Sequence, residues 1–434
     1  MSRTLPILGD AWPLLRDPVG FLAALPARGD LVWLRLGPMP MVMLCDPELT
    51  YRVLKDDRTF DKGGPFFDKL SDLFGDGVGT CPQSKHRRLR RLVQPAFRPA
   101  QMRRYEAVMR EEAARMVESW SDGQDFHVSR TTMAYTGRIV FRTLFSASLT
   151  EELLHGALAD LDDFVAEVPR RMLTPDWLAR LPLPSNRRWQ RTIAGLREAV
   201  DEIVEQRRRQ DTTDESDLLA SMILAHDDED GWLSDAELTD QAVTFLATGT
   251  ETSATTLAWA MYLLATHPKI QRELRDRVAA SGPAPLGDTE DETTALCHRI
   301  IQESLRMYTP PWILTRVATV DTQLGEHHIP AGTAIAYSAY VQHRNPQVYP
   351  DPDTFDPDRW TTQSPPPPCT FIPFGDGPRG CIGNRFAFLE LTAALQALAA
   401  RWELRTLTGE PLRPRIGTTV APHGLRLLVA AGDR

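Results

Sequence analysis

A single cysteine, Cys381, lies in the segment whose residue types and spacing say most about chemistry. The segment is Phe374–Gly383, with the sequence F-G-D-G-P-R-G-C-I-G, and residues 384–401 follow it with apolar side chains at helical spacing. A sulfur atom at a helix N-terminus meets unpaired backbone N–H groups and the positive end of the helix dipole, which favour thiolate over thiol. We therefore predict a metal-binding thiolate at Cys381, with Arg379 as an additional stabilising cation. Glycines 377, 380 and 383 are expected to let the backbone close around a flat ligand.

The pattern F-x-x-G-x-R-x-C-x-G resembles the haem-binding loop of the cytochrome P450 monooxygenases. The resemblance implies that Cys381 is the axial ligand of the iron of haem b, that Phe374 lies at the haem, and that O2 is a co-substrate. The alternative is an inert buried thiol, the usual state of a free cysteine in a core. The other four cysteines show no C-x-x-C spacing, which fits a chain kept in a reducing cytosol.

A long helix is predicted for residues 234–267. Ser234 and Glu237 form a capping box, apolar residues cover most of the helix surface, and Pro268 ends it. Its centre, 248–253, reads T-G-T-E-T-S, where a buried helix would prefer leucine or alanine. We expect Gly249 to let a flat ligand and dioxygen approach. We expect the Thr252 hydroxyl to bond a carbonyl one turn back and open the helix locally.

This centre resembles the family's oxygen-activation motif, A/G-G-x-D/E-T. The resemblance implies that Thr252 supports proton delivery during oxygen activation and that Glu251 relays protons from solvent. Thr248 departs from the motif, since alanine or glycine usually stands there. It either narrows the groove or adds a hydrogen bond to a ligand, and the sequence leaves both open. The alternative for the whole motif is a hydroxyl-rich kink without a chemical role.

Two further sets of charged residues gain meaning from the same resemblance. Haem carries two propionates, which need cations or hydrogen-bond donors. His86 and Arg90 are one helical turn apart and match the family's propionate-binding helix, and Arg316 and Arg379 fill the other expected positions. For each, the alternative is a surface cation in a weak ion pair. A second set is expected to shape the cysteine loop without acting in catalysis: Glu303, Arg306 and Arg359.

Substrate-facing positions follow only from the family resemblance, and each of them could equally be core. They suggest a large apolar pocket without a fixed charged anchor, suited to a hydrocarbon-like substrate. The predicted pocket residues are Phe66, Phe67, Leu70, Leu73, Phe74, Phe164, Val165, Met172, Thr248, Ile313, Leu314, Thr419 and Val420.

The chain of 434 residues is predicted to form one domain, 1–434, because its motifs are spread along it and must meet at one cofactor. The resemblance implies a mainly α fold with small β-sheets (α+β). It implies a triangular, helix-rich domain with haem between the long central helix and the helix after the cysteine loop. A net charge of −9 argues against nucleic acid as a partner. The N-terminal apolar residues are interrupted before a spanning length, so we expect no membrane anchor, a cytoplasmic location and a monomer.

Short phrases in the chain look like those of actinobacterial terpene-oxidising members of the family. We therefore expect hydroxylation or stepwise oxidation of a sesquiterpene or similar small apolar terpenoid in secondary metabolism, including antibiotic biosynthesis. The alternatives are a macrolide- or polyketide-tailoring hydroxylase or epoxidase, and a haem-binding protein or isomerase without oxygenase turnover. Electrons are expected from NAD(P)H through a separate ferredoxin reductase and ferredoxin. The ferredoxin would dock on a basic patch of Arg87, Arg88, Arg98 and Arg385.

Overall fold

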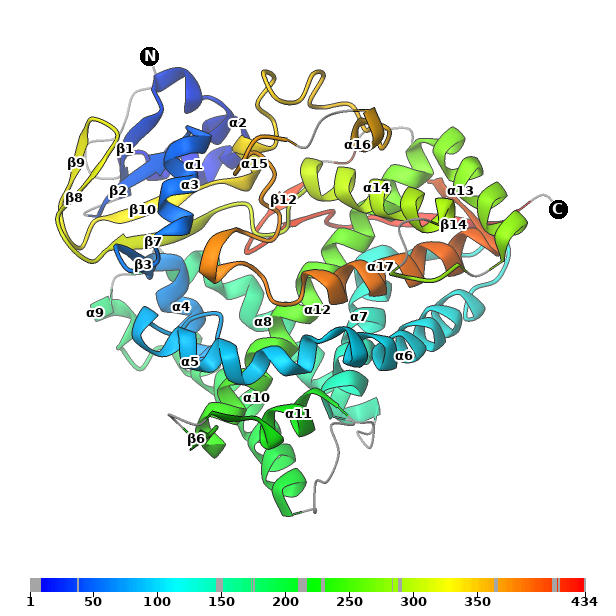
Figure 1. The fold of residues 1–434 in the computed structure, drawn as a ribbon, viewed down its shortest axis with the longest axis horizontal. Helices are drawn as coiled ribbons and strands as arrows, with labels where there is room; N and C mark the ends of the chain where they lie inside the picture. Colours follow the sequence, from blue (N-terminus) through cyan, green and yellow to red (C-terminus); the bar gives the residue numbers. More distant parts are fainter. Residues whose placement is uncertain are drawn as a thin grey trace.

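The computed structural model describes residues 9–36, 39–145, 151–172, 174, 176–209, 217–227, 231–282, 284–287, 291–362, 366–407, 412 and 414–432. Helices make up most of it, and small sheets gather mainly near the N-terminus (Figure 1). The predicted fold class, mainly α with small β-sheets, is confirmed. Within the described residues, no helix combines the length and the apolar character needed to cross a bilayer.

The helices surround two that meet at the centre, α12 and α17 (Figure 1). The α-helices are α1 (Ala11–Arg16), α2 (Pro18–Ala23), α3 (Pro47–Lys55), α4 (Pro65–Phe74), α5 (Gln83–Val93), α6 (Pro99–Glu118), α7 (Val128–Phe145), α8 (Glu151–Met172), α9 (Asp176–Ala179), α10 (Pro184–Arg209), α11 (Leu218–Leu224), α12 (Asp235–Thr266), α13 (Pro268–Ser281), α14 (Glu292–Met307), α15 (Ala339–Gln342), α16 (Arg359–Thr362) and α17 (Asn384–Ala399). Short 3-10 helices are η1 (Pro26–Arg28), η2 (Gln94–Phe97) and η3 (Gly377–Arg379).

The largest sheet has five strands in the order β1-β2-β10-β7-β3, and a three-stranded sheet has the order β11-β14-β4. In the five-stranded sheet, β10 runs parallel to β2, and the other neighbours are antiparallel. Two-stranded pairs are β5-β6, β8-β9 and β12-β13. The strands are β1 (Leu31–Leu36), β2 (Met39–Leu44), β3 (Phe60–Lys62), β4 (Asp125–His127), β5 (His226–Asp227), β6 (Gly231–Trp232), β7 (Leu314–Ala318), β8 (Thr322–Leu324), β9 (His327–Ile329), β10 (Ala334–Tyr337), β11 (Trp402–Thr406), β12 (Arg415–Ile416), β13 (Val420–Ala421) and β14 (Arg426–Ala431).

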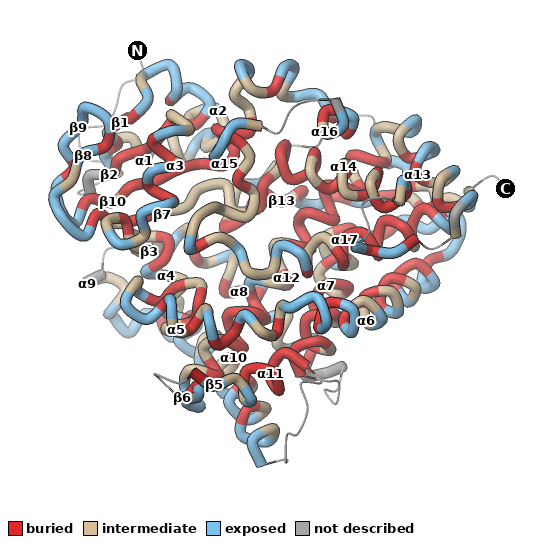
Figure 2. The backbone as a smooth tube through the Cα atoms, in the orientation of Figure 1, coloured by how far each residue is buried: buried red, intermediate tan, exposed pale blue. Residues whose placement is uncertain are grey.

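Helix α12 begins and ends where the sequence predicts. Ser234 is the N-cap, and its capping box with Glu237 is present in both directions, while His267 is the C-cap just before Pro268. Most of the helix is buried (Figure 2). Such burial on all sides explains why its apolar residues do not keep to one stripe.

Helix α7 holds α12 and α17 in place. The Thr136 hydroxyl donates to the Thr250 carbonyl of α12 at 2.9 Å, and the Tyr135 hydroxyl donates to the Glu390 carbonyl of α17 at 2.7 Å. These bonds run from two neighbouring residues to two different helices. They fix the separation of the helices that border the site.

Candidate functional site

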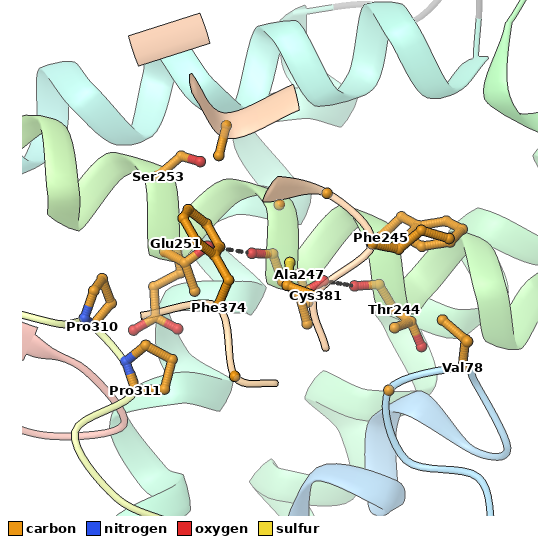
Figure 3. A pocket seen from close by; sticks show the side chains of 18 of the residues that line it. Val78, Thr244, Phe245, Ala247, Glu251, Ser253, Pro310, Pro311, Phe374 and Cys381 are labelled. Atoms are coloured by element: carbon orange, nitrogen blue, oxygen red, sulfur yellow. Dashed lines mark hydrogen bonds between the residues drawn. The ribbon is translucent and has the colours of Figure 1, made fainter. Parts of the chain in front are cut away.

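A cavity lies between α12 and the loop that carries Cys381. It is lined by residues between Lys62 and Leu218, by the centre of α12, and by residues between Leu305 and Thr419. Figure 3 shows Cys381 and Phe374 from the loop, and Thr244 and Glu251 from α12, around this space. The structure therefore brings together every catalytic and cofactor-binding residue predicted from the sequence: Cys381, Phe374, Thr252, Glu251, Gly249, His86, Arg90, Arg316 and Arg379.

The Cys381 thiol lies two residues before the N-cap of α17, and its exposed surface faces the cavity. Its backbone N–H donates to the Phe374 carbonyl at 2.8 Å, which closes the loop beneath the sulfur. Burial raises the pKa of the thiol. The Gly383 N–H, Arg90 and Lys62 act in the opposite direction. Desolvation of the sulfur is the largest of these influences, so the thiolate predicted from the sequence stays a prediction for the metal-bound protein.

Arg379 is not the cation beside the sulfur that the sequence suggested. Its guanidinium bonds the Asp57 carboxylate at 3.2 Å, the Asp61 carboxylate at 2.8 Å and the Cys81 carbonyl at 2.9 Å. Three of its donors thus tie the cysteine loop to the segment around β3 and to the turn before α5. Arg379 still borders the cavity, but most of its hydrogen-bonding capacity is already used.

Gly377 also serves a purpose other than the predicted one. Its backbone has a φ of +69°, and a Cβ there would stand 2.1 Å from the Leu54 carbonyl oxygen of α3. The glycine is required by the close packing of the loop on α3, and not by a ligand in the cavity.

A group of basic side chains borders the cavity near Cys381. Arg316 is 2% exposed, and its Nε and Nη1 have no hydrogen-bond partner among the described residues. Arg90 donates to the Gly380 carbonyl at 2.7 Å. Burial, with Arg379, Lys62 and Arg90 nearby, lowers the pKa of His86 to about 3. Concentrated positive charge with unused donors fits an anionic ligand such as a dicarboxylate, and haem is one.

Lys62 belongs to this group, and the sequence did not reveal it. Its ammonium lies 2.5 Å from the Gly79 carbonyl and 4.7 Å from the centre of the Phe67 ring, and it lines the cavity. Burial lowers the pKa of Lys62 well below its usual value, and Arg316 and Arg379 add to the shift. The only sequence signal was a lysine beside Asp61 in a glycine-rich turn, which reads as an exposed residue.

The predicted geometry at Thr252 is partly confirmed. Its hydroxyl donates to the Thr248 carbonyl at 2.7 Å, yet α12 continues through this point, so the helix does not open. Gly249 borders the cavity, but a Cβ there would point at Val140 of α7, 3.1 Å away. The glycine therefore allows close contact between α7 and α12 in addition to any approach by a ligand.

Glu251 points from α12 to the tip of the β12–β13 hairpin, where the Thr419 hydroxyl donates to its carboxylate at 2.8 Å. Burial raises the pKa of Glu251 to about 7, opposed by the Thr419 bond and helped by Asp162 of α8. Asp162 itself is exposed. Glu251 thus gives the cavity wall a group that exchanges protons near neutral pH, whereas the sequence suggested a pocket without a charged anchor.

A second buried carboxyl, Glu390 of α17, also borders the cavity and was missed. It is 0% exposed, and burial raises its pKa to about 8. The Ser253 hydroxyl lies close enough to lower this pKa slightly, but neither carboxyl oxygen has a partner of good hydrogen-bond geometry among the described residues. Glu390 is therefore poorly partnered among the described residues. In sequence it looks like one charged residue on an amphipathic helix.

The acid–base pair predicted to shape the cysteine loop is present and buried. Glu303 accepts bonds from Arg306 at 2.8 and 2.9 Å, from Arg359 at 3.3 Å and from Trp360 at 3.0 Å. Arg306 also donates to the His343 carbonyl, and the His343 ring accepts from the Ile372 N–H at 2.8 Å. This chain of contacts reaches the loop two residues before Phe374, so the pair lies where it can support the loop.

Most of the predicted substrate-facing residues line the cavity, but four do not. Those that do are Phe66, Phe67, Leu70, Phe74, Phe164, Val165, Thr248, Leu314 and Thr419. Leu73 is buried in the main core, and Met172 packs against that core. Ile313 packs under the five-stranded sheet. Val420 is fully buried, and its carbonyl accepts a bond from Trp259.

Comparison with known proteins places this site in context. The cytochrome P450 family profile matches residues 6–427. The chain is 38% identical to pentalenene oxygenase of Streptomyces avermitilis over 98% of its own length and 96% of the relative's. It is also 38% identical to cyclooctatin synthase of Streptomyces melanosporofaciens, covering 98% and 94% of the two chains. A third relative, cyclooctat-9-en-7-ol 5-monooxygenase of the same species, is 38% identical over 94% and 90%. The chain belongs to the cytochrome P450 family and is a monooxygenase that uses haem and O2.

Proposed function

We propose that this monooxygenase inserts one oxygen atom from O2 into an apolar terpenoid of secondary metabolism. The observation that carries the proposal is the cavity, where Cys381 lies on one side, the Glu251–Thr252 pair on another, and aromatic side chains cover much of the rest. The names of two relatives, which refer to pentalenene and cyclooctat-9-en-7-ol, support a terpenoid. A single domain, 1–434, is proposed with it, because the cavity draws on residues 62 to 419.

The residues at the cavity fit haem. Haem supplies, when bound, the redox centre at which O2 is activated. Cys381 would ligate the iron, and metal binding would offset the burial that otherwise raises the pKa of its thiol. Arg316, Lys62, His86 and Arg90 would hold the propionates, with Arg316 providing two nitrogen donors that no described residue uses.

Proton delivery falls to Glu251 and Thr252. Glu251 has a pKa of about 7, lines the cavity and is influenced by the charge of the exposed Asp162, so it can pass a proton inward at neutral pH. The Thr252 hydroxyl lines the cavity and donates its proton to the Thr248 carbonyl at 2.7 Å, so its lone pairs are left to accept a hydrogen bond. Thr252→Ala should keep haem and substrate binding yet raise the NAD(P)H consumed and hydrogen peroxide released per product. Unchanged coupling would remove Thr252 from this role.

We propose that electrons come from NAD(P)H through a ferredoxin reductase and a ferredoxin. The predicted docking patch is only partly available. Arg87, Arg98 and Arg385 are exposed, but Arg88 pairs with Glu237 at 2.5 Å and donates to the Trp232 carbonyl. Exposed arginines suit an acidic protein partner, since complementary charge speeds the encounter.

Optical difference spectroscopy on the haem-loaded protein tests this function. Sesquiterpenes and diterpenes should shift the haem spectrum from low to high spin, and an incubation with ferredoxin, reductase and NADPH should yield a product heavier by one oxygen. Shifts with macrolactones alone would favour the polyketide-tailoring alternative. The reduced carbon monoxide complex should show the red-shifted Soret band of thiolate ligation. Cys381→Ala should lose that band, and an unchanged spectrum would refute Cys381 as the ligand.

A further inference from the structure

Four threonines stand at every fourth position along the side of α12 that borders the cavity. They are Thr244, Thr248, Thr252 and Thr256, and we call them the threonine row. Side chains four residues apart share a helix face. Each hydroxyl donates to the carbonyl four residues earlier, at 2.7, 2.7, 2.7 and 2.9 Å in chain order. Dashed lines in Figure 3 mark hydrogen bonds of this kind beside Cys381.

These bonds decide what the row can offer a ligand. A hydroxyl group has one proton and two lone pairs, and in each threonine of the row the proton is already donated to the helix. A ligand carbonyl or ether oxygen would have to compete with an intact bond of 2.7 to 2.9 Å. A ligand O–H meets free lone pairs and breaks nothing. The row therefore favours a hydrogen-bond donor over an acceptor.

The other threonines in the lining are used in the same way. Thr80 donates to Gly75 at 2.8 Å and Thr143 to Ile139 at 2.7 Å. On the β12–β13 side, the Thr418 hydroxyl donates to the Val165 carbonyl at 3.2 Å, and Thr419 donates to Glu251. In the described part of the chain, every threonine that lines the cavity thus donates its hydroxyl proton to another group of the protein.

Thr248 is the member of the row best placed to meet a ligand. Between Leu238 and Met261 it is the one described residue of α12 classed as exposed, and the surface it exposes faces the cavity. The cavity that it faces is also lined by aromatic side chains that offer no hydrogen bonds, among them Phe245 and Phe374. When a bound substrate excludes water, an unpaired lone pair of the Thr248 hydroxyl costs free energy. A hydrogen-bond donor on the substrate would remove that cost.

We propose that the substrate carries a free hydroxyl group, which donates a hydrogen bond to Thr248 Oγ1. The inference rests on the proposed terpenoid function and narrows it to terpenoid alcohols. It also places the enzyme in a reaction sequence. An earlier step, either hydroxylation or a cyclisation ended by water, must supply the alcohol, and this enzyme adds a further oxygen atom elsewhere on the skeleton.

The test compares three forms of one carbon skeleton on the haem-loaded protein. Cedrol, cedrene and cedryl methyl ether form one set, and farnesol, farnesene and farnesyl methyl ether form another. Spin-state titration should give a dissociation constant about 10-fold lower for the alcohol than for the hydrocarbon or the ether of the same set, the ratio expected for one good hydrogen bond. An ether that binds as tightly as its alcohol would overturn the proposal, because an ether cannot donate.

Variants assign the preference to one side chain. Thr248→Val replaces the hydroxyl with a methyl group of the same size and should reduce the alcohol preference to within about 2-fold. Thr248→Ser should retain it, and Thr143→Val, which removes another cavity hydroxyl, should leave it unchanged. Retention of the preference in Thr248→Val would overturn the assignment. The carbon monoxide spectrum confirms intact haem ligation in each variant.

The outcomes also distinguish a failure of this inference from a failure of the proposed terpenoid function. If hydrocarbons bind and are oxidised as well as alcohols, the terpenoid monooxygenase stands and the hydroxyl requirement falls. If no terpenoid in either set shifts the spectrum, the terpenoid assignment fails and this inference fails with it.

Discussion

Two sets of buried charged side chains in this protein differ in how completely they are hydrogen-bonded. Behind the cysteine loop, Glu303 and Arg306 are both 0% exposed and lie in ion-pair contact at 2.8 Å. At the cavity, Glu390 is 0% and Arg316 2% exposed, but both carboxyl oxygens of Glu390 and two nitrogens of Arg316 lack partners among the described residues. Depth of burial is nearly the same, and only the completeness of hydrogen bonding differs.

The contrast separates charged side chains that stabilise the fold from charged side chains that are available to bind a ligand. All five N–H donors of Arg306 are used, on Glu303 and on three carbonyls of the segment from His343 to Thr354. Because all of its donors are used within the protein, Arg306 has none left to bind a ligand. Leaving a buried polar group unpaired costs roughly 1 to 3 kcal/mol, so Arg316 and Glu390 are costly unless something that enters the cavity repays the cost.

Removal of Arg306 should have the largest effect. Arg306→Met leaves the Glu303 carboxylate buried without its main partner, which typically destabilises a protein by about 3 to 5 kcal/mol. We expect low yield and a much lower urea midpoint, with haem loss only as a consequence of unfolding. Arg103→Met, at an exposed position, should change stability by less than about 0.5 kcal/mol. A urea midpoint for Arg306→Met close to that of the parent would show that Arg306 does not stabilise the fold in this way.

Removal of Arg316 should have the opposite pattern. Arg316→Met eliminates a buried charge with two nitrogens that have no partner among the described residues, so the haem-free protein should be as stable as the parent or more so. The haem-loaded protein should release haem to apomyoglobin about 10- to 100-fold faster, since charge-assisted hydrogen bonds contribute about 1.5 to 3 kcal/mol. Arg379→Met is the matched comparison, because it breaks contacts with Asp57 and Asp61 and should destabilise both forms. Equal haem release by parent and Arg316→Met would contradict the binding role.

The sequence could predict features whose causes are local. The bounds of α12 follow from the capping box at Ser234 and the stop at Pro268, and both are present. Arg316 and Glu390 could not be told from ordinary charges by local pattern, because their burial is produced by elements distant in the sequence. The same limit explains Leu73 and Val420, which face the core and not the cavity. Which side of an apolar segment meets a cavity depends on what packs against the other side.

Glu390, the buried carboxyl at the cavity, should give the protein a pH-dependent stability. Its pKa is raised from 4.5 to about 8 in the folded protein, so the folded state holds a proton that the unfolded state releases above pH 4.5. The stability due to neutral Glu390 is therefore complete below pH 4.5 and is lost as pH rises toward 8, by at most about 1.4 kcal/mol per pH unit. Glu390→Gln stays neutral and should lack this loss.

The useful window is pH 6.5 to 8. His86 has its pKa lowered from 6.5 to about 3, so its contribution rises with pH only below 6.5 and is constant above. The titration of Glu251 contributes equally to the stability of the parent and of Glu390→Gln. Urea midpoints of parent and Glu390→Gln should diverge from pH 6.5 to pH 8 in favour of the variant. Parallel midpoints across this window would mean that Glu390 finds a partner in solution.

The smallest effects are expected for charges at the surface, where water satisfies what the protein does not. Arg98 is exposed, whereas Arg88 is paired with Glu237 beside the N-cap of α12. Arg98→Glu should slow turnover supported by the proposed ferredoxin by roughly 2- to 5-fold at low ionic strength, and the difference should shrink with added salt as the charges are screened. Turnover driven by hydrogen peroxide should not change. Arg88→Glu should instead lower stability and both activities together, because it sets two carboxylates side by side at a helix start. If Arg98→Glu lowers both activities equally, Arg98 has a structural role like that of Arg306. The difference between charges that are fully hydrogen-bonded and charges that are free to bind a partner would then not apply at the surface.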